Sequence, residues 1–195
     1  MPQRKKGQLK IFFSYAESIG KTEAMLKAAC AAQKQGVDVL VGYIAPHTAP
    51  QTRALQRSLP CLPPLRIGDQ EEFDLDRALL RRPALILVDE LAHQNAQGCR
   101  HRRRCQDVDE LLKAGIDVYT TVNVGNIESL HDTVASITGI TTWDRIPDSV
   151  FDGADQVELI DIEPQELIGR LSGPPVTVRM SRFSIRMSSL NPPAA

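Results

Sequence analysis

The turn formed by residues 19–22 constrains the fold of this chain more than any other feature. An apolar run, residues 9–13, leads into Ile19, Gly20, Lys21 and Thr22, and a helix-patterned stretch follows directly. At such a strand-to-helix turn, backbone N–H groups point at a bound anion, the lysine reaches the β- and γ-phosphates of a nucleotide, and the threonine hydroxyl holds Mg²⁺. The pattern therefore predicts the second half of a phosphate-binding loop (P-loop).

The first half of this loop departs from the pattern. Tyr15 stands where the full pattern has a glycine, and Glu17 places a carboxylate where a polyphosphate would lie. The plainer interpretation of the Gly-Lys-Thr string is a capped turn with a surface lysine.

A second apolar run, residues 84–88, ends in two carboxylates, Asp89 and Glu90. In P-loop proteins the first acid holds Mg²⁺ through water, and the second orients or deprotonates an attacking water. The alternative is a core strand followed by solvated acids. Because both motifs occur in the expected order, each at the carboxyl end of a strand, they favour a P-loop fold.

Length and composition agree with one compact domain. With 195 residues, of which 42% are hydrophobic and 24% charged, the chain can bury a core without disulfides or metal. The net charge of −1 gives no general attraction to nucleic acid or anionic membranes. The sequence shows neither an apolar run of roughly 18 residues nor a signal peptide. We therefore expect a cytoplasmic location, no membrane insertion and no direct nucleic-acid partner.

Apolar runs alternate with helical periods along the chain, which is typical of an α/β fold with a mostly parallel sheet and helices on both faces. This predicts a P-loop-type three-layer fold. The expected strands are 9–13, 37–43, 84–88, 116–122 and 157–162, and the expected helices are 21–36, 48–59, 75–81, 106–114, 127–137 and 164–171.

Three further segments lie outside this alternation. Residues 60–68 contain three prolines and are expected to be irregular or an edge element. Residues 1–8 form a basic N-terminal tail, and residues 172–195 a divergent C-terminal tail with arginines but no acids. The predicted domain therefore spans residues 9–171.

A family resemblance becomes specific after the second acidic motif. Asp89-Glu90-Leu91-Ala92-His93-Gln94-Asn95-Ala96 is followed by Gly98, Arg100-His101 and Gln106-Asp107-Val108, with further ordered matches such as 114–124. This stretch resembles the N-terminal cytoplasmic domain of KdpD-type sensor histidine kinases, which respond to potassium limitation and osmotic conditions. The resemblance implies a P-loop α/β domain that reports a cytosolic signal. In full-length relatives a second cytosolic module, membrane helices and a kinase core follow, and we do not expect this chain to be a complete histidine kinase.

The departures from the family lie where the chemistry is expected. Relatives have a glycine-rich first loop where this chain has Ser14, Tyr15, Glu17 and Ser18. Their Glu-Thr-His-Gly-Arg motif after the second strand is replaced by residues 45–49, Ala-Pro-His-Thr-Ala. Loss of one arginine that pairs with phosphate removes about 1.5–3 kcal/mol. We therefore expect weakened or absent nucleotide binding, and a truncated or frame-shifted gene product is a further hypothesis.

The loop of residues 93–105 allows other interpretations. His93, Cys99, His101 and Cys105 are potential Zn²⁺ ligands, but their spacing matches no standard zinc motif and the neighbouring arginines oppose a cation. We therefore expect no zinc, two exposed thiols, and a solvated basic run at 100–104. The remaining candidates, His47, His131 and Trp143, receive structural roles: a loop or helix-face histidine and a packed indole.

Two functions from different classes follow. The first is a regulatory module of a potassium two-component system that binds ATP and Mg²⁺ weakly through Ile19, Gly20, Lys21, Thr22, Asp89 and Asn123. The expected partners are a histidine-kinase core or other sensor-kinase subunit, or a second copy in a homodimer. The second function is a slow Mg²⁺-dependent hydrolase, with Thr22 and Asp89 on the metal and Glu90 as the catalytic base. A remnant that binds no nucleotide and acts only through protein partners is the third alternative.

Overall fold

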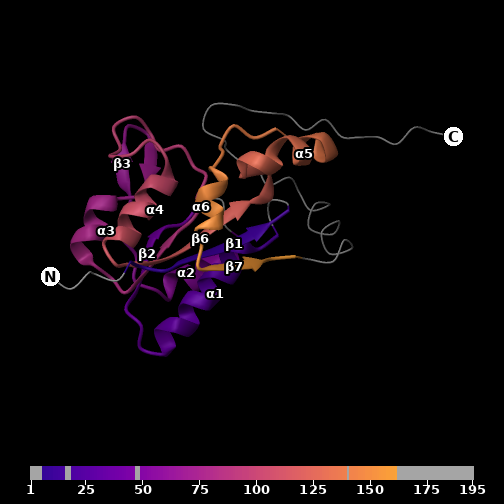
Figure 1. Ribbon diagram of the computed structural model, residues 1–195. Coiled ribbons are helices and arrows are strands. Elements are labelled where there is room, and N and C mark those ends of the chain that lie inside the picture. The colour runs from indigo at the N-terminus through magenta and orange to yellow at the C-terminus, as the bar shows by residue number, and fades with distance from the viewer. Residues whose placement is uncertain (1–5, 16–18, 47–48, 140, 162–195) are drawn as a thin grey trace. The chain divides into compact units, whose positions relative to one another are not determined.

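The computed structural model describes residues 6–15, 19–46, 49–139 and 141–161. Within them, a parallel five-stranded sheet has the order β2-β5-β6-β1-β7 (Figure 1). Its strands are β1 (Leu9–Ser14), β2 (Val39–Tyr43), β5 (Leu85–Val88), β6 (Asp117–Asn123) and β7 (Gln156–Leu159). The predicted α/β class and mostly parallel sheet are confirmed.

Helices cover both faces of this sheet (Figure 1). Helices α1 (Lys21–Lys34) and α2 (Pro50–Arg57) lie on one face, and α3 (Leu75–Arg81) and α4 (Arg104–Lys113) lie on the other. Beyond β6 follow the 3₁₀ turn η1 (Val124–Asn126) and helices α5 (Glu128–Thr138) and α6 (Asp148–Asp152). Each of these α-helices described before residue 139 overlaps a range predicted from the apolar periodicity.

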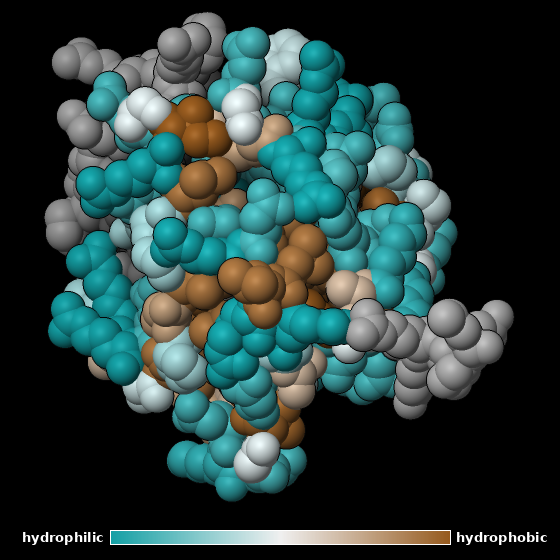
Figure 2. Space-filling model, turned by 90° about the vertical axis from the view of Figure 1, so that its left-hand side faces the viewer, coloured by the Kyte–Doolittle hydropathy of each residue, from teal (hydrophilic) through white to brown (hydrophobic). Residues whose placement is uncertain are grey.

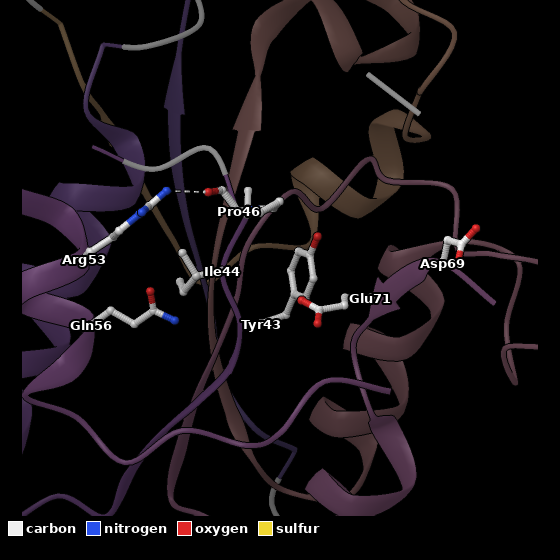
Figure 3. A pocket seen from close by; sticks show the side chains of 8 residues that line it. Tyr43, Ile44, Pro46, Arg53, Gln56, Asp69 and Glu71 are labelled. Carbon is white, nitrogen blue, oxygen red and sulfur yellow. Dashed lines mark hydrogen bonds between the residues drawn. The ribbon is translucent and has the colours of Figure 1, made fainter. Parts of the chain in front are cut away.

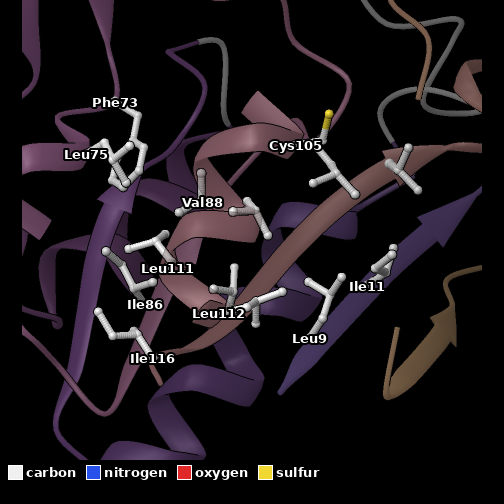
Figure 4. Packing of buried hydrophobic residues seen from close by; sticks show 14 of the residues in the cluster. Leu9, Ile11, Phe73, Leu75, Ile86, Val88, Cys105, Leu111, Leu112 and Ile116 are labelled. Carbon is white, nitrogen blue, oxygen red and sulfur yellow. The ribbon is translucent and has the colours of Figure 1, made fainter. Parts of the chain in front are cut away.

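The strands bury both faces because successive side chains alternate. On β5, Leu85 and Leu87 pack with α1, whereas Ile86 and Val88 pack with α3 and α4. The second of these cores gathers apolar side chains from β1, β5, α3 and α4 (Figure 4). A strand that is buried on both faces has a continuous hydrophobic sequence, and for this reason the central strands could be predicted from the sequence.

The proline-rich segment covers the β2 edge of the sheet. Val41 donates its N–H to the Pro60 carbonyl, and Leu62 donates to the Val41 carbonyl, both at 2.8 Å. The chain then turns into an antiparallel hairpin of β3 (Leu65–Ile67) and β4 (Gln70–Glu72). The prediction of an irregular or edge element at residues 60–68 is confirmed.

The strand order places β6 between β1 and β5. The strand that leads to residues 19–22, β1, and the strand that precedes Asp89, β5, are therefore second neighbours, roughly 10 Å apart at about 4.8 Å per strand. Asn123, at the carboxyl end of β6, fills the interval between them. This arrangement gives the end of β6 a place in any site that the two motifs form.

Some predicted details differ from the structure. Helix α4 begins at Arg104 rather than at residue 106, and β7 ends at Leu159. The predicted helix 164–171 and both tails lie outside the described residues, apart from residues 6–8, so the domain boundaries stay a prediction. No helix in the described ranges is long and apolar enough to cross a membrane.

The prediction of a packed indole is wrong. Trp143 is 85% exposed and belongs to neither apolar core, whereas Ile146 in the same loop after α5 is fully buried. His131, by contrast, is buried on α5, and its Nδ1 lies 3.0 Å from the Gly125 carbonyl oxygen. Figure 2 shows another face of the molecule, where apolar groups interrupt a mostly polar surface.

We expect the apolar core between the sheet and helices α3 and α4, called the α4 core below, to contribute most of the folding stability. Leu111 is fully buried on α4, so Leu111→Ala should lower the free energy of unfolding by about 2–5 kcal/mol through lost transfer energy and a cavity. The matched control Leu80→Ala changes a side chain that is 85% exposed and should cost less than about 0.5 kcal/mol. Urea denaturation measures both, and equal losses would contradict the assignment of this core.

Candidate functional site at the carboxyl edge of the sheet

Lys21 brings the first motif to the centre of the carboxyl edge. It is the first residue of α1, and Gly20 before it has φ 105°, a conformation that glycine adopts without a Cβ clash. The Lys21 Nζ atom donates to Asn123 Oδ1 at 2.5 Å and to Ser14 Oγ at 2.9 Å. The ends of β1, β6 and α1 are thus joined at one ammonium group.

Thr22 and Asp89 bring the two motifs together. Thr22 Oγ1 donates to Asp89 Oδ2 at 3.1 Å, and its distance to Asp89 Oδ1 is 3.3 Å. A hydroxyl and a carboxylate in direct contact at the carboxyl edge are oxygen ligands that suit Mg²⁺ or its bound water. The predicted pairing of these two side chains is therefore present in the geometry.

Two groups that the sequence did not single out hold Asp89. Thr121 Oγ1 donates to Asp89 Oδ1 at 2.5 Å, and the Ala45 N–H donates to Asp89 Oδ2 at 3.3 Å. Asp89 is 1% exposed, and such donors compensate for the removal of its carboxylate from water. Thr121 stands two residues before Asn123, so a polar side chain in a buried strand was the available signal.

Glu90 occupies an unusual backbone conformation beside this cluster. Its φ is 60°, in the left-handed region that non-glycine residues rarely adopt. The Glu90 N–H donates to Thr121 Oγ1 at 3.1 Å, and the Leu91 N–H donates to the Thr121 carbonyl at 2.9 Å. Thr121 therefore fixes the backbone turn at Glu90.

Of the other predicted site residues, Ile19 is 5% exposed. Its side chain packs inward, so a ligand would meet its backbone. Lys21, Thr22, Asp89 and Asn123 are brought together as predicted.

Behind Asp89 lies a buried guanidinium group that the sequence did not reveal. Arg104 is fully buried, and its Nη1 donates to the Asp89 carbonyl oxygen at 3.1 Å. Its Nη2 donates to Glu72 Oε2 at 2.9 Å, its Nε donates to Asn95 Oδ1 at 3.2 Å, and its guanidinium carbon lies 4.3 Å from the centre of the Tyr43 ring. Arg104 therefore links α4 to β2, to β4 and to the loop after β5.

The electrostatics of this cluster follow from burial and charge. Burial raises the pKa of the Glu72 carboxyl, but the hydrogen bond from His93 and the charges of His93 and Arg104 outweigh it, so the pKa lies below its ordinary value. Burial raises the pKa of Tyr43 to about 12, although the Arg104 charge opposes this. Glu72 is therefore ionised and the Tyr43 phenol is protonated at neutral pH.

The prediction of a solvated basic run at 100–104 is wrong for Arg104, which is buried. Arg100 is exposed as predicted, and it pairs with Asp76 at 2.6 Å and with Glu110 at 2.8 Å. The acids that neutralise these arginines come from β4, α3 and α4, which a local pattern does not show.

The expectation of two exposed thiols is also wrong for Cys105. Cys105 is buried in the α4 core, while Cys99 is half-buried. The two histidines of this loop pair with acids: His93 Nε2 lies 3.1 Å from Glu72 Oε2, and His101 Nε2 lies 2.7 Å from Glu110 Oε2. Within the described ranges, no group of three or more histidine, cysteine or acidic side chains is placed to hold a metal ion.

Comparison with known proteins shows the family to which this chain belongs. The family described as KdpD, osmosensitive K⁺ channel His kinase sensor domain, matches residues 5–182. This chain belongs to the KdpD family. It is 53% identical over 173 residues to a sensor protein KdpD of Clostridium acetobutylicum, covering 87% of this chain and 19% of that protein. It is 50% identical over 170 residues to the sensor protein KdpD of Escherichia coli K12, covering 85% of this chain and 19% of that protein.

A putative sensor protein KdpD of Synechocystis is 38% identical over 174 residues, which cover 87% of this chain and 47% of that protein. The chain thus spans about a fifth of the first two relatives and about half of the third. The family resemblance expected from the residues is confirmed.

The Asp107 carboxyl gives this site a testable pH dependence. Burial raises its pKa to about 6, although the hydrogen bond from Asn95 Nδ2, at 2.7 Å, and the Arg104 charge lower it. Aspartate in the unfolded chain has a pKa of about 3.9, so the folded protein holds this proton more tightly. The stability that this group contributes is present below about pH 4 and is lost as the pH rises through about 6.

We expect Asp107→Asn to remove this dependence, because asparagine keeps an acceptor for Asn95 without a charge. The variant should gain stability relative to the native protein between pH 4 and pH 7, on the order of 1–2 kcal/mol. Urea denaturation of both proteins at pH 4 and pH 7 measures the difference in their free energies of unfolding. The other carboxylates are the same in both proteins, so their contributions cancel in this difference. An equal offset at both pH values would contradict the raised pKa.

Proposed function

We propose that this KdpD-family chain is a regulatory domain of a potassium-responsive two-component system and that it binds ATP with Mg²⁺ weakly at the carboxyl edge of its sheet. One observation carries the proposal: two hydrogen-bonded pairs, Lys21–Asn123 and Thr22–Asp89, lie side by side at the carboxyl edge, although Thr22 and Asp89 are 67 residues apart in the sequence. The domain would act in the cytoplasm.

Each group has a role that its geometry supports. The Lys21 ammonium would exchange its contacts with Asn123 and Ser14 for phosphate oxygens. Thr22 and Asp89 would hold Mg²⁺, directly and through water respectively. The Asn123 amide would contact the terminal phosphate, and the backbone N–H groups of Ile19 and Gly20 would line the anion site.

Binding would serve regulation through differential affinity for two states of a larger assembly. The curated relatives are named sensor proteins, and about four-fifths of the length of the first two lies outside the match. We propose a histidine-kinase core or another sensor-kinase subunit as the partner, with a homodimer as the alternative. A remnant that binds no nucleotide would use the same partners.

We expect the native chain to bind ATP·Mg²⁺ in calorimetry and Lys21→Ala to lose at least about tenfold in affinity, because a charge-assisted contact to phosphate contributes about 1.5–3 kcal/mol. Lys113→Ala is the matched control, since Lys113 is 70% exposed on α4 and pairs with Asp109. It should leave the affinity unchanged. Because Glu17 opposes an anion at this loop, Glu17→Gly should tighten binding. Absence of binding in both the native chain and Glu17→Gly would contradict the proposal.

A second candidate function is slow hydrolysis of the nucleotide. It is favoured by the position of Glu90, which directly follows Asp89 and is held in a left-handed conformation beside the proposed metal site. Strained backbone of this kind recurs where a side chain must take part in chemistry.

For this hydrolase, Glu90→Gln should lower Mg²⁺-dependent phosphate release by about 10²–10⁴-fold while ATP binding persists, because general-base catalysis contributes about that factor. Phosphate release is measured by a coupled assay, and binding by calorimetry on the same preparations. Release that is absent in the native chain, or equal in Glu90→Gln, would rule out catalysis by Glu90 and leave the regulatory function.

A further inference from the structure

A groove lies at the carboxyl end of β2, beside the proposed nucleotide site. Its volume is about 510 Å³, and it is bounded by the end of β2, helix α2 and the β3–β4 hairpin (Figure 3). This volume is within the range of about 300–1,000 Å³ that small-molecule sites occupy. Along the edge of the sheet the order is β2, β5, β6, β1, so Asp89, directly after β5, lies between the groove and residues 19–22.

The floor of the groove is apolar and rigid. It consists of the Tyr43 ring and of Ile44 and Pro46 (Figure 3). The Tyr43 ring is fixed from behind by the Arg104 guanidinium, and its phenol, whose pKa burial raises to about 12, stays a hydrogen-bond donor. This floor suits the carbon body of a small ligand.

The two walls carry opposite chemistry. On one side α2 presents Arg53 and Gln56, which are three residues apart and therefore lie on one helix face. On the other side the hairpin presents two acids, Asp69 in the turn between β3 and β4 and Glu71 on β4. Figure 3 shows the basic and amide groups across the Tyr43 ring from the two acids.

The partners that these side chains have in the described structure are weak ones. Glu71 pairs with Arg66 at 3.3 Å, but the side chains are 54% and 78% exposed, and exposed pairs contribute only about 0–1 kcal/mol. Arg53 donates to the Pro46 carbonyl at 3.1 Å, which leaves other N–H groups of the guanidinium for a ligand. A ligand with both charges can therefore replace these contacts at little cost.

We propose that this groove is a second binding site, for a small amphoteric molecule that places an ammonium or guanidinium group between Asp69 and Glu71 and a carboxylate against Arg53 and Gln56. The carbon chain between the two groups would lie over Tyr43. Free amino acids with a basic side chain have this chemistry. Binding at this site does not require that the P-loop bind nucleotide.

Hydrogen bonds connect the groove to Asp89, directly after β5. On β4, Glu71 faces the groove while the next residue, Glu72, is buried and holds Arg104. Arg104 in turn donates to the Asp89 carbonyl, and the N–H of Ala45, a groove residue, donates to the Asp89 carboxylate. A ligand that fixes β2 and β4 would therefore fix Asp89 as well, and by linkage the two sites would change each other's affinity equally.

The proposal is tested with L-arginine as the probe, titrated into the ¹⁵N-labelled full chain and followed by NMR. We expect a dissociation constant of about 1 mM or tighter, with resonance changes at residues 43–46, 53–56 and 69–71. The double variant Asp69→Asn, Glu71→Gln should weaken binding at least about tenfold, and Arg53→Gln should weaken it as well, because each removes a charge-assisted hydrogen bond.

Asp132→Asn is the matched control, because it removes an exposed carboxylate on α5 and should leave the affinity for L-arginine unchanged. Repeating the titration in Lys21→Ala keeps the result independent of nucleotide binding, so persistence of L-arginine binding there distinguishes the two sites. No response up to about 10 mM, or equal affinity in Asp69→Asn, Glu71→Gln, would overturn the proposal. Competitive displacement of L-arginine by ATP·Mg²⁺ would also overturn it, since the groove would then be part of the nucleotide site.

Discussion

The buried guanidinium group of Arg104 is the interaction on which the acidic side of this domain depends. It contacts the Asp89 carbonyl, Glu72, Asn95 and the Tyr43 ring, so one side chain joins α4 to β2, β4 and the loop after β5. Breaking a buried ion pair costs about 3–5 kcal/mol, because the remaining charge is left without a partner in a medium of low polarity. Exposed pairs such as Lys113–Asp109 contribute about 1 kcal/mol or less. The loop of residues 93–103 is therefore held from its buried end, and its surface arginines add little.

The strand order decides what the carboxyl edge can do. Because β6 lies between β1 and β5, Thr121 and Asn123 stand between the phosphate-loop residues and the acids. Thr121 orients the Asp89 carboxylate and fixes the Glu90 backbone, while Asn123 receives the Lys21 ammonium. The acid and the amide are thus positioned by the sheet, and the lysine and the threonine by the first turn of α1.

The same edge continues into the groove at the end of β2. Alternation along β4 sends Glu71 to the groove and Glu72 to Arg104, so a single strand connects an exposed wall with a buried support of Asp89. A regulatory domain requires a ligand-dependent difference between two states, and small shifts of a packed strand can supply it. The proposed functions of the two sites are therefore compatible with one mechanical unit, although each is tested separately.

The sequence by itself determined the five strands of the main sheet, most of the helices and the residues that meet at its carboxyl edge, because these depend on local signals. Apolar runs on strands buried on both faces, helical periodicity and the Gly-Lys-Thr turn are each contained within a few residues. Only the tertiary structure decided the burial of Arg104 and Cys105, the exposure of Trp143 and the support of Asp89 by Thr121 and Ala45. Glu72 is 32 residues from Arg104 in the sequence, and the charge of Arg104 is tolerated inside the protein only because that carboxylate is brought to it. A local pattern shows which side chains are polar, whereas the fold decides which of them lose contact with water.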